Sequence, residues 1–97
     1  MEIHINDKKT VYVAYDHDTF LGQLRVEPCV EGFEVCRVLV EEEFRGRGVA
    51  SALLRHVIRD YQDKKLVGYT DKVSMGRVFE NAGFKHKSDY AFYELGG

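Results

Sequence analysis

The stretch EEEFRGRGVASALL, residues 41–54, joins an apolar strand pattern to a helical one. Gly46 and Gly48 stand at the junction, although glycine destabilises the interior of either element. Arg45 and Arg47 add two positive charges at the same place. A loop that enters a helix presents unpaired backbone N–H groups and the positive end of the helix dipole. This combination predicts a binding loop for a phosphate or pyrophosphate.

Helical spacing follows the loop and appears once more near the C-terminus. Apolar residues between Val49 and Tyr61 recur three and four positions apart, which predicts an amphipathic helix. The stretch SMGRVFENAGF, residues 74–84, predicts a second helix that ends at Gly83. Its apolar face should carry Met75, Val78, Phe79 and Ala82.

The remaining segments have strand patterns. The strand–helix–strand crossover from FEVCRVLV to KLVGYT predicts two parallel neighbours. The pair TVYVAYD and FLGQLRVE predicts an antiparallel hairpin, with PCVEG as the next break. We therefore expect an α/β (α+β mixed) sheet that is mostly antiparallel, with one parallel pair and two main helices. The predicted strands are residues 2–5, 10–16, 20–27, 33–40, 65–70, 84–87 and 90–95.

Composition sets limits on the class of protein. A chain of 97 residues forms one domain, residues 1–97. The net charge of −2 gives no general attraction to nucleic acid or to an anionic membrane. Cys29 and Cys36 lack a partner set at zinc-like spacing, so we expect no metal and two buried, reduced thiols. Without a membrane-spanning run or a signal peptide, the expected location is cytoplasmic.

Two familiar phosphate loops do not fit residues 45–51. A P-loop requires the pattern GxxxxGK[ST], and no lysine follows Gly48. A dinucleotide fingerprint requires GxGxxG, but the third position is Ser51. Residues 41–44 also lie between the strand and the first glycine, whereas that turn is normally tight.

A third pattern fits better. RGRGVA resembles the R/Q-x-x-G-x-G/A signature of the GNAT superfamily of N-acetyltransferases, with Arg45, Gly48 and Ala50 in the signature positions. VLVEEEFRGRGVASALL resembles that family's fourth strand, pyrophosphate loop and third helix, and RVFENAGFK resembles its late helix and GF corner. The resemblance spans roughly residues 11–95, and two motifs in the right order are more specific than one. It implies a GNAT-like fold that uses acetyl-coenzyme A (acetyl-CoA) as cosubstrate.

The resemblance also implies a set of cofactor-binding residues. The backbone of residues 45–50 would hold the pyrophosphate, and the strand end at residues 38–40 would pair with the pantetheine arm. Ser74 and Phe79 would contact the cofactor from the late helix. Lys72 departs from the family pattern, which often has a cofactor-contacting asparagine there. The full expected set is Val38, Leu39, Val40, Arg45, Gly46, Arg47, Gly48, Val49, Ala50, Ser51, Ser74 and Phe79.

Acetyl transfer requires a neutral amine, so a carboxylate near the acceptor is a reasonable base. Glu34 is the candidate: it precedes Arg45 by the same interval as the catalytic glutamate of the histone acetyltransferase branch. Alternation places it on one strand face with Cys36, Val38 and Val40. Many family members carry a tyrosine acid where this chain has Phe79. Tyr90 and Tyr93 are potential substitutes, although aromatic residues in a terminal strand more often serve packing.

Family members usually insert two helices between their first and second strands, where this chain has only NDKK, residues 6–9. The acceptor side should therefore be open, which suits a lysine or terminal amine of a protein. One alternative is a small-molecule acetyltransferase completed by homodimerisation. The other is a CoA-binding module that has lost catalysis.

Overall fold

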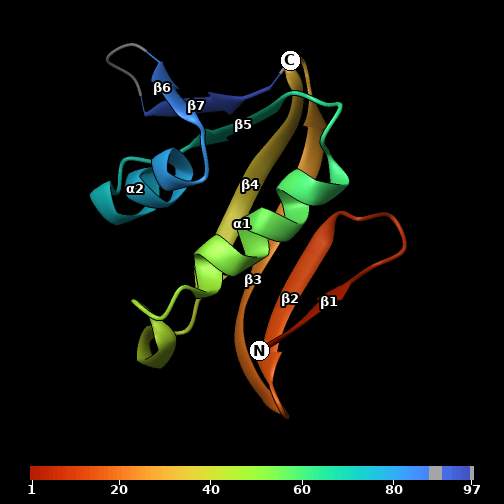
Figure 1. The fold of residues 1–97 in the computed structure, drawn as a ribbon, viewed down its shortest axis with the longest axis vertical. Helices are drawn as coiled ribbons and strands as arrows, with labels where there is room; N and C mark the ends of the chain where they lie inside the picture. Colours follow the sequence, from red (N-terminus) through yellow and green to blue (C-terminus); the bar gives the residue numbers. More distant parts are fainter. Residues whose placement is uncertain (88–90, 97) are drawn as a thin grey trace.

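The computed structural model describes residues 1–87 and 91–96, which form one mixed sheet and two α-helices (Figure 1). The sheet order is β1-β2-β3-β4-β5-β7-β6, and only the β4–β5 pair is parallel among the described strands. The predicted mixed sheet is confirmed. Its elements are β1 Glu2–Ile5, β2 Val11–Asp16, β3 Thr19–Cys29, β4 Gly32–Val40, η1 Glu42–Phe44, α1 Val49–Asp60, β5 Leu66–Tyr69, α2 Val73–Asn81, β6 Lys85–Lys87 and β7 Phe92–Leu95.

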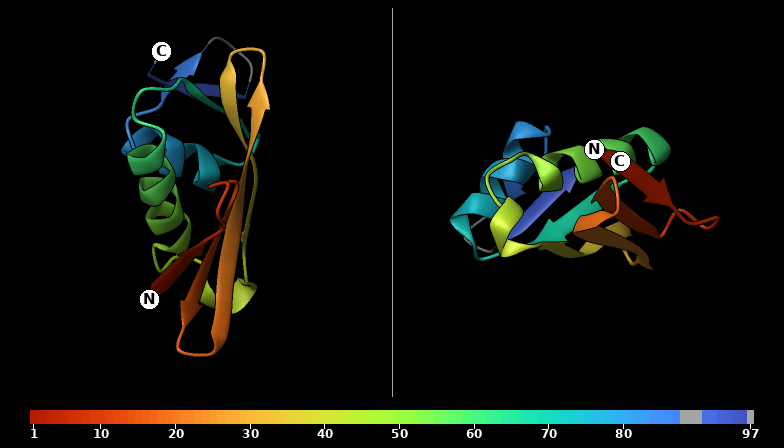
Figure 2. Two further views of the ribbon diagram at one scale, coloured as in Figure 1. Left: turned by 90° about the vertical axis from the view of Figure 1, so that its right-hand side faces the viewer. Right: turned by 90° about the horizontal axis from the view of Figure 1, so that it is seen from below.

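Both helices cover the same face of the sheet (Figure 2). The apolar stripe of α1 is buried on that face with Tyr12 and Leu24, and the buried area supplies the main favourable term of folding. Phe79 of α2 lies against Gly68 of β5, where a Cβ atom would collide with its ring. The opposite face carries no helix within the described residues, and we call it the helix-free face.

The hairpins β1–β2 and β2–β3 follow one another along the chain and share β2. Asn6 closes the β1–β2 turn, because its side-chain oxygen accepts hydrogen bonds from the N–H groups of Thr10 and Val11 at 2.8 and 3.0 Å. No helix therefore lies between β1 and β2. The expected break at PCVEG is present but shorter than predicted: β3 continues to Cys29, which pairs with Gly32 across a turn at residues 30–31.

A β-bulge in β4 corrects the predicted strand faces. Val35 pairs with Val26, but Arg37 pairs with Arg25, so Cys36 is one extra residue on β4. The insertion changes the alternation by one position. Beyond the bulge, the residues that face the helices are Val38 and Val40, which pack against the same core as Phe33 and Val35.

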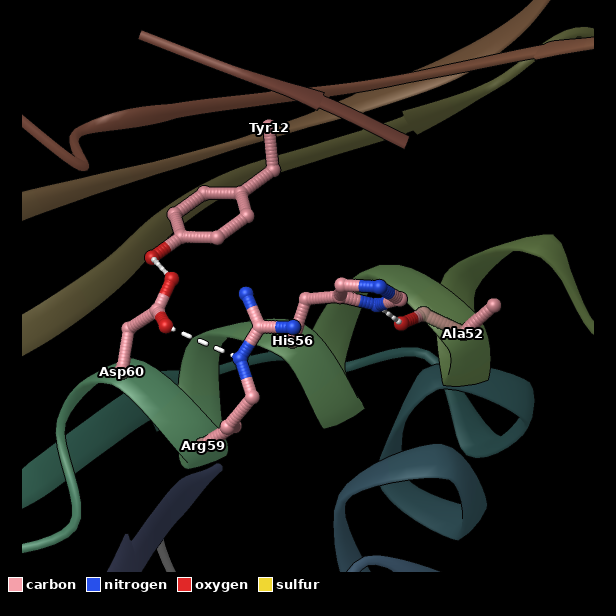
Figure 3. A network of polar contacts seen from close by, with 5 residues as sticks. All are labelled: Tyr12, Ala52, His56, Arg59 and Asp60. Carbon is pink, nitrogen blue, oxygen red and sulfur yellow. Dashed lines mark hydrogen bonds and ion pairs between the residues drawn. The ribbon is translucent and has the colours of Figure 1, made fainter. Parts of the chain in front are cut away.

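A polar network ties the C-terminal end of α1 to the sheet (Figure 3). The fully buried Tyr12 donates its hydroxyl proton to Asp60 at 2.9 Å, and Arg59 Nε donates to the same carboxylate at 3.0 Å. Arg59, and then Tyr12, hold the pKa of Asp60 below its ordinary value, while burial and the Asp60 hydrogen bond raise the pKa of Tyr12. One turn earlier, His56 Nδ1 lies 2.8 Å from the Ala52 carbonyl oxygen. No helix of the described residues is long and apolar enough to cross a membrane.

Candidate functional site

A cleft opens where β4 and β5 separate. The two strands pair only from Phe33–Leu66 to Val35–Gly68, and the bulge at Cys36 begins where that pairing stops. The cleft has a volume of about 580 Å³, within the range typical of small-molecule sites. Eleven of the twelve residues predicted to bind a cofactor line it: Val38, Leu39, Val40, Arg45, Gly46, Gly48, Val49, Ala50, Ser51, Ser74 and Phe79.

The glycine loop keeps its backbone accessible at one end of the cleft. Gly46 and Gly48 have φ angles of 79° and 81°, in the left-handed region that favours glycine. Gly48 is the N-cap of α1, and no side chain caps the helix there. The first-turn N–H groups have no partner within the helix. Arg45 is fixed beside them, because its Nε donates to the carbonyl oxygen of Val40 at 3.1 Å.

Arg47 is the predicted cofactor residue that the structure does not bring into the cleft. Its guanidinium carbon lies 5.6 Å from the centre of the Phe44 ring, in cation–π range. It lines a smaller hollow beside Asp16 and Leu21 instead. Gly46 and Gly48, both of positive φ, flank Arg47 in the chain.

The cleft is electrically positive. The described residues that line it include Arg37, Arg45 and Lys72, and none of them is acidic. The N-terminal end of the α1 dipole adds to this charge. The arrangement favours an anionic ligand that extends from the loop along β4.

Cys36 differs from the expected buried thiol, because it is exposed and lines the cleft. As the bulged residue, it cannot pair as its neighbours do, and its Sγ donates to the Arg25 carbonyl oxygen at 3.5 Å. Partial burial, and then the carboxylate of Glu27, raise the pKa of this thiol. Cys29 is only partly buried.

Glu34 lies outside the cleft lining, at the point where β4 and β5 still pair. Its partners are Glu27 on β3 and Val67 on β5, and all three lie on the helix-free face. The predicted face shared with Val38 and Val40 is therefore wrong, because the bulge intervenes. The acid is instead at the closed end of the cleft, on the side away from both helices.

The aromatic residues near α2 also have definite places. Tyr93 is buried and stacked on Phe79, with ring centres 5.3 Å apart, and it does not line the cleft. It therefore packs and offers no proton to the cleft, while Tyr90 lies outside the described residues. Lys72 and Ser74 both line the cleft at the start of α2.

Several lining residues were missed in the sequence. The positions of Cys36 and Arg37 in the cleft lining depend on the bulge, which the alternation of side chains along a strand does not reveal. A usable signal existed for Tyr69 and Thr70, because ligands of open α/β sheets bind beyond the carboxyl ends of parallel strands. The other missed lining residues are Val35, Phe44, Lys72, Met75 and Val78.

Comparison with known proteins agrees with this geometry. Residues 7–94 match the family model described as an acetyltransferase (GNAT) domain. No curated protein matches the sequence.

Three solved structures illustrate the likeness of fold. The ribosomal-protein-S18-alanine N-acetyltransferase of Escherichia coli has a TM-score of 0.73 at 12% identity, over 93% of this chain and 70% of that one. Naa50 of Arabidopsis thaliana, solved with the bisubstrate analogue CoA-Ac-MVNAL, has a TM-score of 0.68 at 19% identity, over 97% and 82%. The PaiA N-acetyltransferase of Thermoplasma acidophilum, solved with coenzyme A, has a TM-score of 0.72 at 14% identity, over 90% and 60%.

Proposed function

Because the chain belongs to the GNAT acetyltransferase family, we propose that it transfers the acetyl group of acetyl-CoA to an amine, specifically a lysine or terminal amine of a protein. The observation that carries this proposal is the positively charged cleft between β4 and β5, with the open glycine loop at one end. Its shape and charge suit a long anionic thioester. No metal is required by this chemistry.

In this proposal the loop and the strand hold the cosubstrate. The free N–H groups at the start of α1, with Arg45, bind the pyrophosphate. The edge of β4 beyond Val35 no longer pairs with β5, so its backbone groups are available to the pantetheine arm. Backbone N–H groups near Val40 polarise the thioester carbonyl.

The acceptor amine approaches from the helix-free face. Its nitrogen attacks the carbonyl carbon, the carbon–sulfur bond breaks, and the thiolate of coenzyme A leaves with a proton from water. Glu34 accepts the proton that the nitrogen loses, directly or through water. A protein amine is favoured because no described helix walls that face, and because one similar structure is named for acetylating a ribosomal protein.

The first test is a calorimetric titration with acetyl-CoA. We expect micromolar affinity, about −8 kcal/mol, for the wild type and none for Gly48→Glu, whose carboxylate repels the pyrophosphate. Gly83→Glu is the matched control: it introduces the same charge at another glycine of positive φ, outside the cleft lining. An absence of binding in all three proteins would overturn the proposal.

The second test addresses Glu34. In Glu34→Gln we expect turnover to fall by roughly 100-fold or more, with the affinity for acetyl-CoA unchanged. Normal turnover would show that another group is the base. A wild type that binds acetyl-CoA but acetylates no amine would identify a CoA-binding module instead.

A small-molecule enzyme completed by homodimerisation is the second candidate, and a charge pattern on the helix-free face favours it. Arg25 lies opposite Arg37, and Glu27 lies opposite Glu34. Like charges directly opposite one another destabilise a lone sheet. A two-fold axis lying between the two rows, in the plane of contact, would set each basic row against the partner's acidic row.

Light scattering tests the second candidate. A dimer that separates in Arg25→Glu, with activity lost on dilution, would favour it over the protein acetyltransferase. A monomer at every concentration would exclude it.

A further inference from the structure

Tyr69 is an exposed aromatic residue on the wall of the cleft. It ends β5, lines the cleft, and remains 55% exposed although it is large and mainly apolar. Alternation from Val67 places it on the helix-free face with Glu34. Its ring packs against that of Phe92 on β7, with the ring centres 4.9 Å apart.

Two carboxylates act on this tyrosine. Partial desolvation, followed by the charges of Glu31 and Glu34, raises the pKa of its hydroxyl. Neither carboxylate forms an ion pair within residues 1–87 and 91–96. Lys65, which also lies near Glu31, is already paired with Glu94 at 2.9 Å. The charges of two carboxylates therefore reach the Tyr69 hydroxyl, and carboxylates attract a cation.

The two ends of the cleft consequently differ in the charged groups around them. Arg45 and the start of α1 make the loop end positive. At the Tyr69 end the charges of Glu31 and Glu34 act from outside the lining, although Arg37 and Lys72 also line the cleft. An anionic cosubstrate explains the first end but not the second. The second end fits a cation, which an exposed aromatic ring and nearby carboxylates both attract.

We propose that Tyr69, together with Glu31 and Glu34, forms the acceptor end of the cleft and selects an amine carried on a segment with additional positive charge. A lysine flanked by other basic residues is the acceptor class. This inference rests on the proposed function and adds the substrate preference. Tyr69 binds and orients the acceptor in this proposal, and the proton still passes from the amine nitrogen to Glu34.

The experiment compares two acceptor peptides that carry the same lysine, one flanked by arginines and the other by glutamates. For the wild type we expect kcat/KM to favour the basic peptide by roughly tenfold or more, with the ratio falling as salt is added. Tyr69→Leu should raise KM for the basic peptide about threefold to tenfold, the loss of a cation–π contact. Tyr69→Phe should stay within about twofold, because the ring remains.

Charge variants complete the design. Glu31→Gln should reduce the preference, whereas Glu43→Gln, an acidic residue of η1 outside the cleft lining, should leave it unchanged. The affinity for acetyl-CoA, measured by calorimetry, should be the same in Tyr69→Leu and the wild type.

Three results would overturn the inference. One is a wild type that turns over both peptides equally or prefers the acidic one, which leaves the proposed function standing. Another is a Tyr69→Leu variant that loses affinity for acetyl-CoA, which would assign Tyr69 to the cosubstrate. The third is the absence of both acetyl-CoA binding and turnover, which removes the proposed function as well.

Discussion

The two ends of α1 are built on opposite principles. At its C-terminal end, Asp60 is bonded to Tyr12 and Arg59, and the N–H of Tyr61 bonds to the Val57 carbonyl. At its N-terminal end, Gly48 caps the helix without a side chain, and the first turn carries no acidic residue. One end satisfies its polar groups within the protein, and the other leaves its donors open.

The contrast shows how one helix serves both stability and binding. A serine or aspartate cap is worth typically about 1 kcal/mol, and the chain does without it at the loop. The C-terminal end of α1, which we call the fixed end, keeps the helix on the sheet. The N-terminal end, which we call the open end, faces the cleft. Mutations at the two ends should therefore separate folding from ligand binding.

The largest expected effect is a loss of stability at the fixed end. Asp60→Ala leaves the buried Tyr12 hydroxyl without its acceptor, so we expect the free energy of unfolding to fall by about 2 kcal/mol. Urea denaturation measures this, with Asp60→Asn as the control that retains an acceptor. Calorimetry should show unchanged acetyl-CoA affinity in the folded variant; a weakened affinity would show that the two ends of α1 do not act independently.

The open end should respond with opposite signs for stability and binding. Ser51→Glu places a carboxylate in the first turn of α1, which should raise the free energy of unfolding by roughly 0.5 kcal/mol. The same charge should weaken acetyl-CoA binding about tenfold or more, because it competes with the pyrophosphate for the open donors. Ser51→Gln controls for size. Tighter binding in Ser51→Glu would show that the phosphate lies elsewhere.

Acidic pH should reduce the stability that Asp60 contributes at the fixed end. The pKa of folded Asp60 lies below its ordinary value of 3.8, so the ionised carboxylate stabilises the fold above that pH. The stabilisation is lost as pH falls through the folded pKa. We expect the stability difference between the wild type and Asp60→Asn to narrow below about pH 4. Urea titrations from neutral to acidic pH measure it, and a difference independent of pH would contradict the assignment.

The smallest effect should come from Tyr61, just after the helix. Its hydroxyl donates to the Lys9 carbonyl oxygen at 2.7 Å, in an exposed bond. Tyr61→Phe should lower the free energy of unfolding by roughly 0.5 kcal/mol, since water replaces the lost partner. Thermal denaturation is sensitive enough to detect it. A loss as large as that of Asp60→Ala would mean that the exposed bond from Tyr61 to Lys9 holds the fixed end as strongly as the buried bond of Asp60 does.

Much of the fold was predictable, because helical spacing and the glycine loop are local signals. Val49 to Tyr61 gave the helix, and the crossover rule gave the parallel neighbours β4 and β5. The bulge at Cys36 was not predictable, since a period of two looks the same on either side of an inserted residue. This single insertion accounts for the wrong face assigned to Glu34 and for the unexpected exposure of Cys36.

The site residues also divide into those set by local signals and those set by contacts remote in sequence. The loop residues of the predicted set fell into the cleft because the backbone itself forms the site there. Arg47 did not, because its side chain lies over the Phe44 ring, a contact that a sequence pattern does not report. Tyr69 depends on where β5 ends relative to a strand remote in sequence, which periodicity does not report.

The short pairing of β4 with β5 has a consequence for thermal behaviour. The sheet consists of two arms joined along residues 33–35 and 66–68, and the cleft begins where that seam ends. A molecule bound in the cleft contacts both arms and bridges β4 and β5 where they no longer pair. By mass action, a ligand at 100 times its dissociation constant adds about 2.7 kcal/mol to the unfolding free energy. The melting temperature therefore reports how much of the cleft is occupied. Acceptors and thioesters can be ranked by the rise they cause before any product is detected.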